Sequence, residues 1–247
     1  MDTRVLERHT DHRPWPLPSR PWIMFQSWQQ LLFMHWRVPL EQLRPMVPAP
    51  LLLEEFDGSA WIGLVPFRVV DLHARMLPRI PGLSNFPEMN LRTYVRHNNR
   101  SGVFFFTLEA ASIAAVIGAR TLYALPYHHA KMRVARHGEW IDYRSRRTND
   151  RVEFIGRYRP TGPVFHAKPG TLEYFLAERY ALFTVLHGRR VLRGDIHHLP
   201  WPLQPAEAHV DVNTVLDAYG LNGVAAQPPL LHYAERQDTL IWLPRKD

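Results

Sequence analysis

The sequence predicts an α+β fold built mainly from antiparallel strands with a few helices. Residues 89–96 alternate strictly between apolar and polar side chains, which is typical of a half-buried strand. Asp57-Gly58 and His137-Gly138 each separate two strand-like segments, as hairpin turns do. The chain has 247 residues, 46% hydrophobic and 21% charged, so it can bury its own core and is not a disordered segment.

Prolines punctuate the beginning of the chain. Four prolines between positions 14 and 21 predict that residues 1–21 form an extended arm that lies over the domain and is not helical. Residues 22–247 are expected to form a single domain, because no repeat or low-complexity linker interrupts them. We find neither the apolar core of a signal peptide nor a run approaching the roughly 20 apolar residues of a membrane span, which favours a cytoplasmic location.

The first half of the chain predicts strands around one short helix. Residues 22–38 are rich in aromatic and large aliphatic side chains, which favours a buried strand, although periodicity alone leaves a helix open. Pro39 suits the first position of a short helix that ends at or soon after Pro45. The other strands expected here are 51–56, 61–70, 89–96 and 103–108.

The second half predicts three more helices among further strands. Residues 110–117 form an alanine-rich helix ended by Gly118, and Thr171 caps a helix over residues 172–186. A short helix at 212–218 ends before Gly220. The strands expected here are 132–135, 140–145, 152–158, 191–197, 230–234 and 239–243.

The chain is basic, and its basic residues are almost all arginines. The net charge is +7, and only Lys131, Lys168 and Lys246 are lysines. The densest basic stretch, residues 131–159, interleaves arginines with aromatic residues, a composition that a single-stranded nucleic-acid platform also uses. On strands the same alternation puts the charges on a solvated face and the aromatic side chains in the core. We favour this second interpretation and keep nucleic-acid binding as an alternative.

Several chemistries are excluded by what the sequence lacks. Without cysteine there is no disulfide framework, thiolate metal site or cysteine nucleophile. No G-x-S-x-G, Walker loop or dinucleotide fingerprint occurs, so no cofactor is expected. The pair His197-His198 raises a metal site as an alternative, but adjacent strand residues face opposite sides and no H-E-x-x-H occurs, so no metal is expected.

Two segments concentrate side chains suited to acid–base chemistry. Tyr127, His128 and Lys131 follow a helix-ending proline; on a strand Tyr127 and Lys131 share a face and His128 lies opposite. A histidine here could act as a general acid or base, and the structural alternative is an ordinary strand start.

The polar face of the strand at 89–96 is the second such segment. Glu88, Asn90 and Arg92 share one parity, as residues lining a cleft or a barrel interior do. A guanidinium beside Glu88 would lower the pKa of its carboxyl group, and a structural ion pair is the alternative.

Two further positions carry arginine candidates. Arg37, at the end of an apolar run, could clamp a substrate carboxylate, and a solvated strand end is the alternative. Glu178-Arg179-Tyr180 falls on the helix expected at 172–186, where a solvated face or a structural ion pair is expected.

Several motifs together resemble the YqjF-like family of uncharacterised proteins. They are PWIMFQSW (21–28), HWRV (35–38), FPEMNLRTYV (86–95), LPY (125–127), PGTLE (169–173) and IHHLPWPLQ (196–204). The match covers nearly the whole chain after the arm. That family looks like a branch of the acetoacetate-decarboxylase-like superfamily, which implies a cone-like, mostly antiparallel β barrel or double sheet around a small-molecule pocket.

The resemblance also implies roles for particular residues. The decarboxylases of the superfamily carry an arginine before a first short helix, a glutamate that opens a central strand, and two adjacent lysines after a helix-ending proline. By position, Arg37 looks like the arginine and Glu88 like the glutamate. Tyr127 and His128 stand where the lysine pair would be, so the resemblance implies the pocket and not decarboxylation through an imine. Lys131 could replace the missing nucleophile only by displacement along the strand.

The leading hypothesis is a barrel protein that binds a small carboxylate or oxo-acid. Arg37, Asn90 and Arg92 would bind the substrate, and Glu88, Tyr127 and His128 would transfer protons in a non-imine lyase, hydratase or isomerase. A non-catalytic binding or sensing module and a nucleic-acid-binding protein are the alternatives. Related barrels imply a homo-oligomer by analogy.

Overall fold

Long strands dominate the computed structural model, which describes residues 3–79 and 84–247. The strands are β1 (Met24–Val38), β2 (Leu52–Leu53), β3 (Ala60–Ala74), β4 (Phe86–His97), β5 (Arg100–Ala110), β6 (Tyr127–His137), β7 (Trp140–Arg147), β8 (Glu153–Pro160), β9 (Ala181–Leu186), β10 (Arg190–His197), β11 (Gln204–Asn213), β12 (Leu230–Ile241) and β13 (Arg245–Lys246). The helices are α1 (Thr3–Arg8), α2 (Leu40–Leu43), α3 (Ile113–Tyr123) and α4 (Leu172–Ala177), with 3₁₀ turns at Arg44–Met46, Asp217–Tyr219 and Val224–Ala226.

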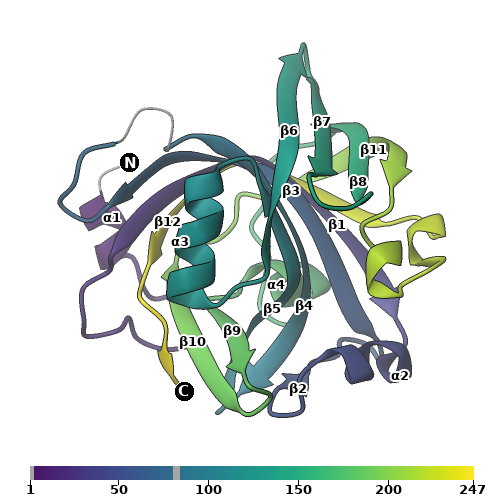
Figure 1. Ribbon diagram of the computed structural model, residues 1–247. Coiled ribbons are helices and arrows are strands. Elements are labelled where there is room, and N and C mark those ends of the chain that lie inside the picture. Colours follow the sequence, from purple (N-terminus) through teal and green to yellow (C-terminus); the bar gives the residue numbers. More distant parts are fainter. Residues whose placement is uncertain (1–2, 80–83) are drawn as a thin grey trace.

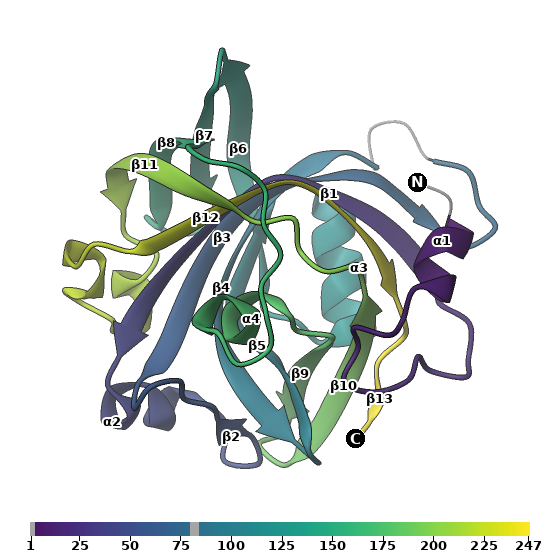
Figure 2. The same ribbon diagram turned by 180° about the vertical axis from the view of Figure 1, so that it is seen from behind.

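The strands form one sheet that curls until it meets itself. β12, β1, β3, β4 and β5 pair antiparallel in that order, β5 then pairs with β9, β9 with β10, and β10 again with β12. These strands therefore close a cone-like ring, with α3 on one side and α4 on the other (Figures 1 and 2). The fold class predicted from the sequence, mostly antiparallel strands in a cone-like arrangement with flanking helices, is confirmed.

Both faces of the central strands are buried, which explains their unbroken apolar runs. On β1, Leu31 and Phe33 belong to the buried cluster that surrounds the cavity described below, whereas Leu32 and Met34 belong to a second cluster. That second cluster joins the ring to β7 and β8 through Tyr143 and other side chains. Because successive side chains of a strand point to opposite faces, neighbouring residues of β1 pack in two different buried clusters.

The N-terminal arm contains a helix that the prolines did not predict. α1 spans Thr3–Arg8, before the first proline, and its Leu6 is 1% exposed against Trp22 and Trp242. The main-chain oxygen of Leu6 accepts a hydrogen bond from His197 Nε2 at 2.7 Å. The expected extended arm at residues 1–21 is thus partly helical, because an apolar side chain at position 6 finds a buried site.

Two expected helices differ from the structure in length. The helix expected at 172–186 ends at Ala177, and residues 181–186 form β9, because they pair with β5 and β10 and complete the ring. Thr171 caps α4 as expected, accepting from the main-chain N–H of Tyr174. The helix expected to stop at Gly118 instead runs from Ile113 to Tyr123 and ends at Ala124, which has a left-handed φ of 51°.

Predictions for three further segments also need correction. The strand expected at 51–56 is reduced to β2, Leu52–Leu53. The helix expected at 212–218 is wrong, because β11 runs to Asn213 and only a 3₁₀ turn follows. The two strands expected at the end, 230–234 and 239–243, are one strand, β12. It pairs with β11 near its start and with β1 of the ring along its length, including its polar middle.

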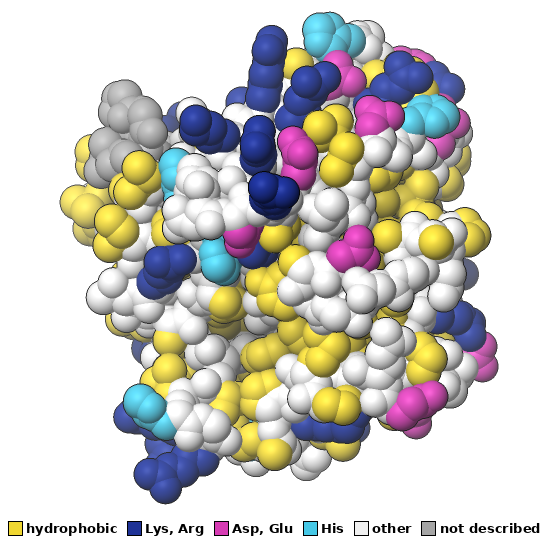
Figure 3. Space-filling model, turned by 45° about the vertical axis from the view of Figure 1, so that its right-hand side comes forward, with side chains coloured by type: hydrophobic (Ala, Val, Ile, Leu, Met, Phe, Trp, Pro, Cys, Tyr) yellow, Lys and Arg dark blue, Asp and Glu magenta, His cyan; other side chains and the backbone are white. Residues whose placement is uncertain are grey.

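The arginine-rich strands project from the ring. β6 and β7 form a hairpin that projects beyond the ring (Figure 1), and Lys and Arg side chains gather on it (Figure 3). Tyr143, Phe154 and Tyr158 point into the core, as the strand interpretation requires. Arg159 forms ion pairs with Glu139 and Glu207, so part of the positive charge is neutralised locally. Nucleic-acid binding by this hairpin stays a prediction.

Candidate functional site

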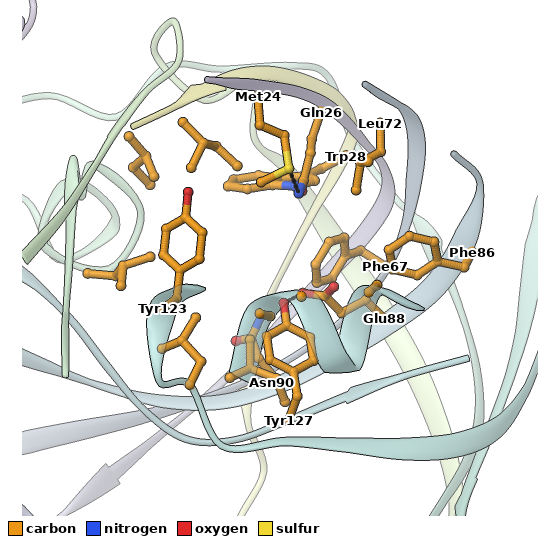
Figure 4. Close-up of a pocket in the computed structure, with 18 of the residues that line it drawn as sticks. Met24, Gln26, Trp28, Phe67, Leu72, Phe86, Glu88, Asn90, Tyr123 and Tyr127 are labelled. Atoms are coloured by element: carbon orange, nitrogen blue, oxygen red, sulfur yellow. Dashed lines mark hydrogen bonds between the residues drawn. The ribbon is translucent and has the colours of Figure 1, made fainter. Parts of the chain in front are cut away.

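A cavity of about 380 Å³ lies inside the ring of strands. Its walls come from β1, β3, β4 and β5, from α3 and the start of β6, and from the segment between α4 and β9 (Figure 4). Most of the lining is apolar, with a few polar groups that converge on it, which is the usual composition of a small-molecule site.

Strand β4 supplies a row of four side chains along one wall. Phe86, Glu88, Asn90 and Arg92 all line the cavity, because β4 pairs regularly with β3 and alternate residues face the same side. At about 3.3 Å per residue the row is about 20 Å long. The structure therefore brings together three residues that the sequence placed on one face, Glu88, Asn90 and Arg92.

Glu88 is a buried carboxyl group with one phenol partner. Its side chain is 6% exposed, and the hydroxyl of Tyr127 donates a hydrogen bond to Oε1 at 3.0 Å. Burial raises the pKa of Glu88 from 4.5 to about 8, and the Tyr127 hydrogen bond lowers it only in part. We had expected a neighbouring arginine to lower this pKa; the described residues place no arginine in an ion pair with Glu88, so desolvation dominates.

Tyr127 reaches Glu88 because a helix ends just before it. α3 ends at Ala124, and Tyr127 begins β6 beside Leu108 of β5, in a parallel register. Burial raises the pKa of Tyr127 well above 10, and the carboxylate of Glu88 raises it further. The phenol therefore stays protonated, and it can donate its hydrogen either to Glu88 or to a bound ligand.

The end of the cavity beyond Asn90 carries two guanidinium groups. Arg179, directly after α4, forms a buried ion pair with Glu54, which also accepts from Arg96. Burial lowers the pKa of Arg179, and the charge of Glu54 opposes this. Arg92 lies 5.5 Å from the ring centroid of Phe33, and within the described residues no carboxylate is close enough to form an ion pair with it.

Three buried polar atoms at this end make no hydrogen bond within the described part of the chain. They are Asn90 Oδ1, Arg92 Nε and Trp201 Nε1. Asn90 and Trp201 are 5% and 3% exposed, and Trp201 packs edge-on against Phe33, 4.9 Å between ring centroids. The two donors, beside a positive charge that no carboxylate of the described residues pairs with, suit an anionic oxygen-rich group, whereas Asn90 Oδ1 is an acceptor and cannot bind such a group.

Arg37 lies outside the cavity. It is at the exposed end of β1, donates to Asp57 at 3.1 Å and covers the ring of Trp61. It has the same parity as Leu31 and Phe33, which line the cavity, but it lies beyond them at the end of the strand, and its neighbour Trp36 is buried on the opposite side in the second cluster. The anion-clamp role expected for Arg37 therefore does not fit the geometry, and the available guanidinium in the cavity is that of Arg92.

His128 and Lys131 do not line the cavity either. His128 lies on the other face of β6 from Tyr127, and burial lowers its pKa, with Arg147 and Arg120 lowering it further. Lys131 is exposed and paired in register with Arg146 of the projecting hairpin. Lys168 and Lys246 are exposed as well, so no lysine of the chain can act as an imine nucleophile in this cavity.

The sequence reasoning missed Arg179, His198 and Trp201. Arg179 was placed on a helix that ends two residues earlier, so the expected solvated face is wrong, whereas the expected structural ion pair exists with Glu54. His198 lines the cavity while His197 points to α1, as adjacent strand-end residues should. Burial lowers the pKa of His198 to about 4, so it is neutral near pH 7. For His198 and Trp201, the motif at 196–204 was the available signal.

Comparisons with known proteins agree with this architecture. The family model DUF2071, described as an uncharacterized conserved protein, matches residues 25–238. The chain is 47% identical over 231 residues to the uncharacterized protein YqjF of Bacillus subtilis (strain 168), covering 93% of this chain and 95% of that protein. In the described part of the chain, no helix combines the length and apolar character needed to cross a bilayer.

Solved structures show the same fold at low sequence identity. The enduracididine biosynthesis enzyme MppR complexed with pyruvate superposes with a TM-score of 0.63 at 12% identity, covering 94% of this chain and 93% of that one. An acetoacetate-decarboxylase-like enzyme from Sphingomonas wittichii RW1 gives 0.63 at 16% identity, covering 92% and 94%. These similarities establish the fold alone.

Proposed function

Because the chain belongs to the DUF2071 family of uncharacterized conserved proteins and folds like acetoacetate-decarboxylase-like enzymes, we propose that its cavity binds an oxo-acid or related carboxylate and catalyses proton transfer without an imine. The observation that carries this proposal is Glu88, a carboxyl group with a pKa of about 8 inside the cavity and hydrogen-bonded to Tyr127. A general base with a pKa close to the working pH is the kind that abstracts protons efficiently.

The chemistry follows from the two side chains. The carboxylate form of Glu88 takes a proton from the carbon next to the ligand's carbonyl group, and the C–H electron pair moves to the carbonyl oxygen as an enolate. Tyr127, no longer needed by the now neutral Glu88, keeps its proton and donates a hydrogen bond to that oxygen, which stabilises the enolate. Return of the proton from Glu88 to carbon restores the ligand or, at another carbon, gives an isomer. Lyases and hydratases that act without an imine can begin with the same step.

The carboxylate of the ligand is assigned to the Arg92 end. Arg92 and Trp201 supply donors, and the pyruvate-bound MppR structure shows that a related fold accommodates a small oxo-acid. Arg37 and His128 take no part in this proposal, because they lie outside the cavity.

Deuterium exchange tests this proposal. We expect the wild-type protein in D₂O to exchange protons next to the carbonyl of oxo-acids, followed by NMR, faster than buffer does. Glu88→Gln should lower that rate by about 10²- to 10⁴-fold, the usual contribution of a general base. Glu235→Gln, the same change at an exposed position, is the matched control.

A non-catalytic binding module is the second candidate, favoured by the exposure of all three lysines. In that case oxo-acids would bind equally to wild-type protein and Glu88→Gln, and none of the oxo-acids tested would exchange its protons with D₂O faster than in buffer. That result would remove the catalytic part of the proposal.

A further inference from the structure

The spacing of Glu88 and Arg92 on β4 constrains the ligand of the proposed function. We propose that this ligand is an elongated, largely apolar carboxylic acid in which several carbons separate the carboxylate from the reacting oxo group. The inference rests on the proposed assignment of Arg92 to the carboxylate and of Glu88 to proton transfer. It distinguishes such a ligand from short 2-oxo acids, in which the two groups are adjacent.

The two side chains are too far apart for a short acid to touch both. They are four residues apart on a strand whose own register with β3 is unbroken, which separates their Cα atoms by about 13 Å. The guanidinium of Arg92 does not lean toward Glu88, because it lies between the rings of Phe33 and Tyr94, at 5.5 and 5.9 Å from their centroids. Tyr94 is further along β4, on the side away from Glu88.

The remaining gap sets the length of the spacer. With the side-chain ends taken to be as far apart as the Cα atoms, contacts of about 3 Å at Arg92 and at Glu88 leave about 7 Å between the ligand's carboxylate and the carbon beside its oxo group. Carbon–carbon bonds of about 1.5 Å in a staggered chain cover that gap in about five or six bonds. The β3 wall alongside is apolar, with Val65 and Phe67 in register with Asn90 and Glu88, and Asn90 is the polar side chain of β4 between the two ends. The spacer is therefore a hydrocarbon chain or ring.

The cavity continues beyond Glu88 to its mouth. The exposed side chains among its lining lie at the end of β3, on the segment after it and on α3, namely Ala74, Leu77, Pro78, Ala114 and Leu122. The polar groups near this end are already engaged, since Trp28 donates to Gln26 at 2.7 Å and Tyr123 donates to the main-chain oxygen of Trp242 at 3.1 Å. An acid thus enters with its charged head first. An alkyl group beyond the oxo carbon then meets only apolar side chains or polar groups that already make hydrogen bonds.

Binding measurements on matched acids test this inference. Isothermal titration calorimetry with propionate, hexanoate and octanoate should show tighter binding by up to about fourfold per added methylene. Among oxo-acids of equal size, 7-oxooctanoate should bind about tenfold more tightly than 2-oxooctanoate. The methyl ester of octanoate should bind at least about tenfold more weakly than octanoate, because it cannot pair with Arg92.

A variant pair checks the head group independently. Arg92→Gln should remove the difference between octanoate and its methyl ester, whereas Arg37→Gln should preserve it. If Arg92→Gln does not fold, the ester comparison in the wild-type protein still decides the question. Equal or tighter binding of 2-oxooctanoate, or no gain in affinity with chain length, would overturn the inference.

The two proposals fail separately. Fast deuterium exchange confined to short 2-oxo acids would keep the proposed proton transfer and overturn the elongated ligand. Tight, length-dependent binding of 7-oxooctanoate without any exchange would support the elongated ligand and remove the catalytic proposal.

Discussion

Glu88 shows how one buried side chain joins function to stability. Its carboxyl group sits among Phe67, Phe86 and Tyr127, where water cannot solvate a charge. The folded protein therefore holds the proton to about pH 8, whereas the unfolded chain releases it near 4.5. A group that costs stability in the charged form is also a base whose proton affinity suits carbon acids near neutral pH.

The pH dependence of stability should expose this group. Between about pH 4.5 and 8 the unfolded state binds fewer protons than the folded state at Glu88, so stability falls as pH rises. Glu88→Gln lacks this dependence. Its free energy of unfolding, minus that of the wild type, should increase by about 1.4 kcal/mol per pH unit in this window. Urea unfolding at pH 5, 6.5 and 8 measures the difference.

The exposed-site variant Glu235→Gln should show no such slope. A constant difference between Glu88→Gln and wild type across the window would mean that Glu88 is already ionised in the folded protein.

Residue parity could be predicted from the sequence, but electrostatic partners could not. Alternation placed Glu88, Asn90 and Arg92 on one face, and the structure agrees. The predicted pKa direction of Glu88 was wrong because burial in the folded ring raises this pKa, and the hydrogen bond from Tyr127, 39 residues away in sequence, lowers it only in part. Arg37 was misplaced because the sequence does not show where along β1 the cavity ends, and Arg37 lies beyond Leu31 and Phe33 at the exposed end of that strand.

At the scale of elements, close packing decides where local preference fails. Residues 181–186 continue an apolar helical pattern after α4, but they form β9 because they complete the ring between β5 and β10. Gly102 permits this junction, since a Cβ there would lie 2.5 Å from the main-chain oxygen of Ala181. Neither the pairing of β9 with β5 and β10 nor the need for glycine at position 102 is visible in a short stretch of sequence. The sequence therefore predicts a longer helix that includes Arg179, and its place in the cavity was missed.

Two glycine substitutions should therefore have opposite effects on stability. Gly102→Ala forces a methyl group against the backbone of β9 and should destabilise the protein by about 1–3 kcal/mol or more. Gly118→Ala lies inside α3, where a Cβ meets no atom within 4 Å, and should stabilise it by about 0.5–1 kcal/mol. Thermal and urea unfolding measure both. Equal shifts for the two variants would contradict the packing argument.

For the whole molecule, the N-terminal segment is part of the closed structure. Leu6 packs with Phe25, Leu240 and Trp242, and Arg13 donates to the main-chain oxygen of Ile196 at 2.8 Å. These contacts join residues up to 236 positions apart in sequence, as Leu6 and Trp242 are. Prolines predicted that this segment would lie over the domain, but the sequence could not show which side chain anchors it, because the receiving site is assembled from β1, β10 and β12.

Leu6→Ala tests whether this anchor stabilises the whole fold. Leu6 is 1% exposed, so its truncation should cost about 2–5 kcal/mol, the usual range for a buried leucine. Val5→Ala, the adjacent position at 37% exposure, should change stability by about 0.5 kcal/mol or less. The loss should appear as a single cooperative transition at lower urea concentration, because α1 and the ring share one hydrophobic cluster. A separate early transition, with the main one unchanged, would instead mean that residues 1–21 fold independently of the ring.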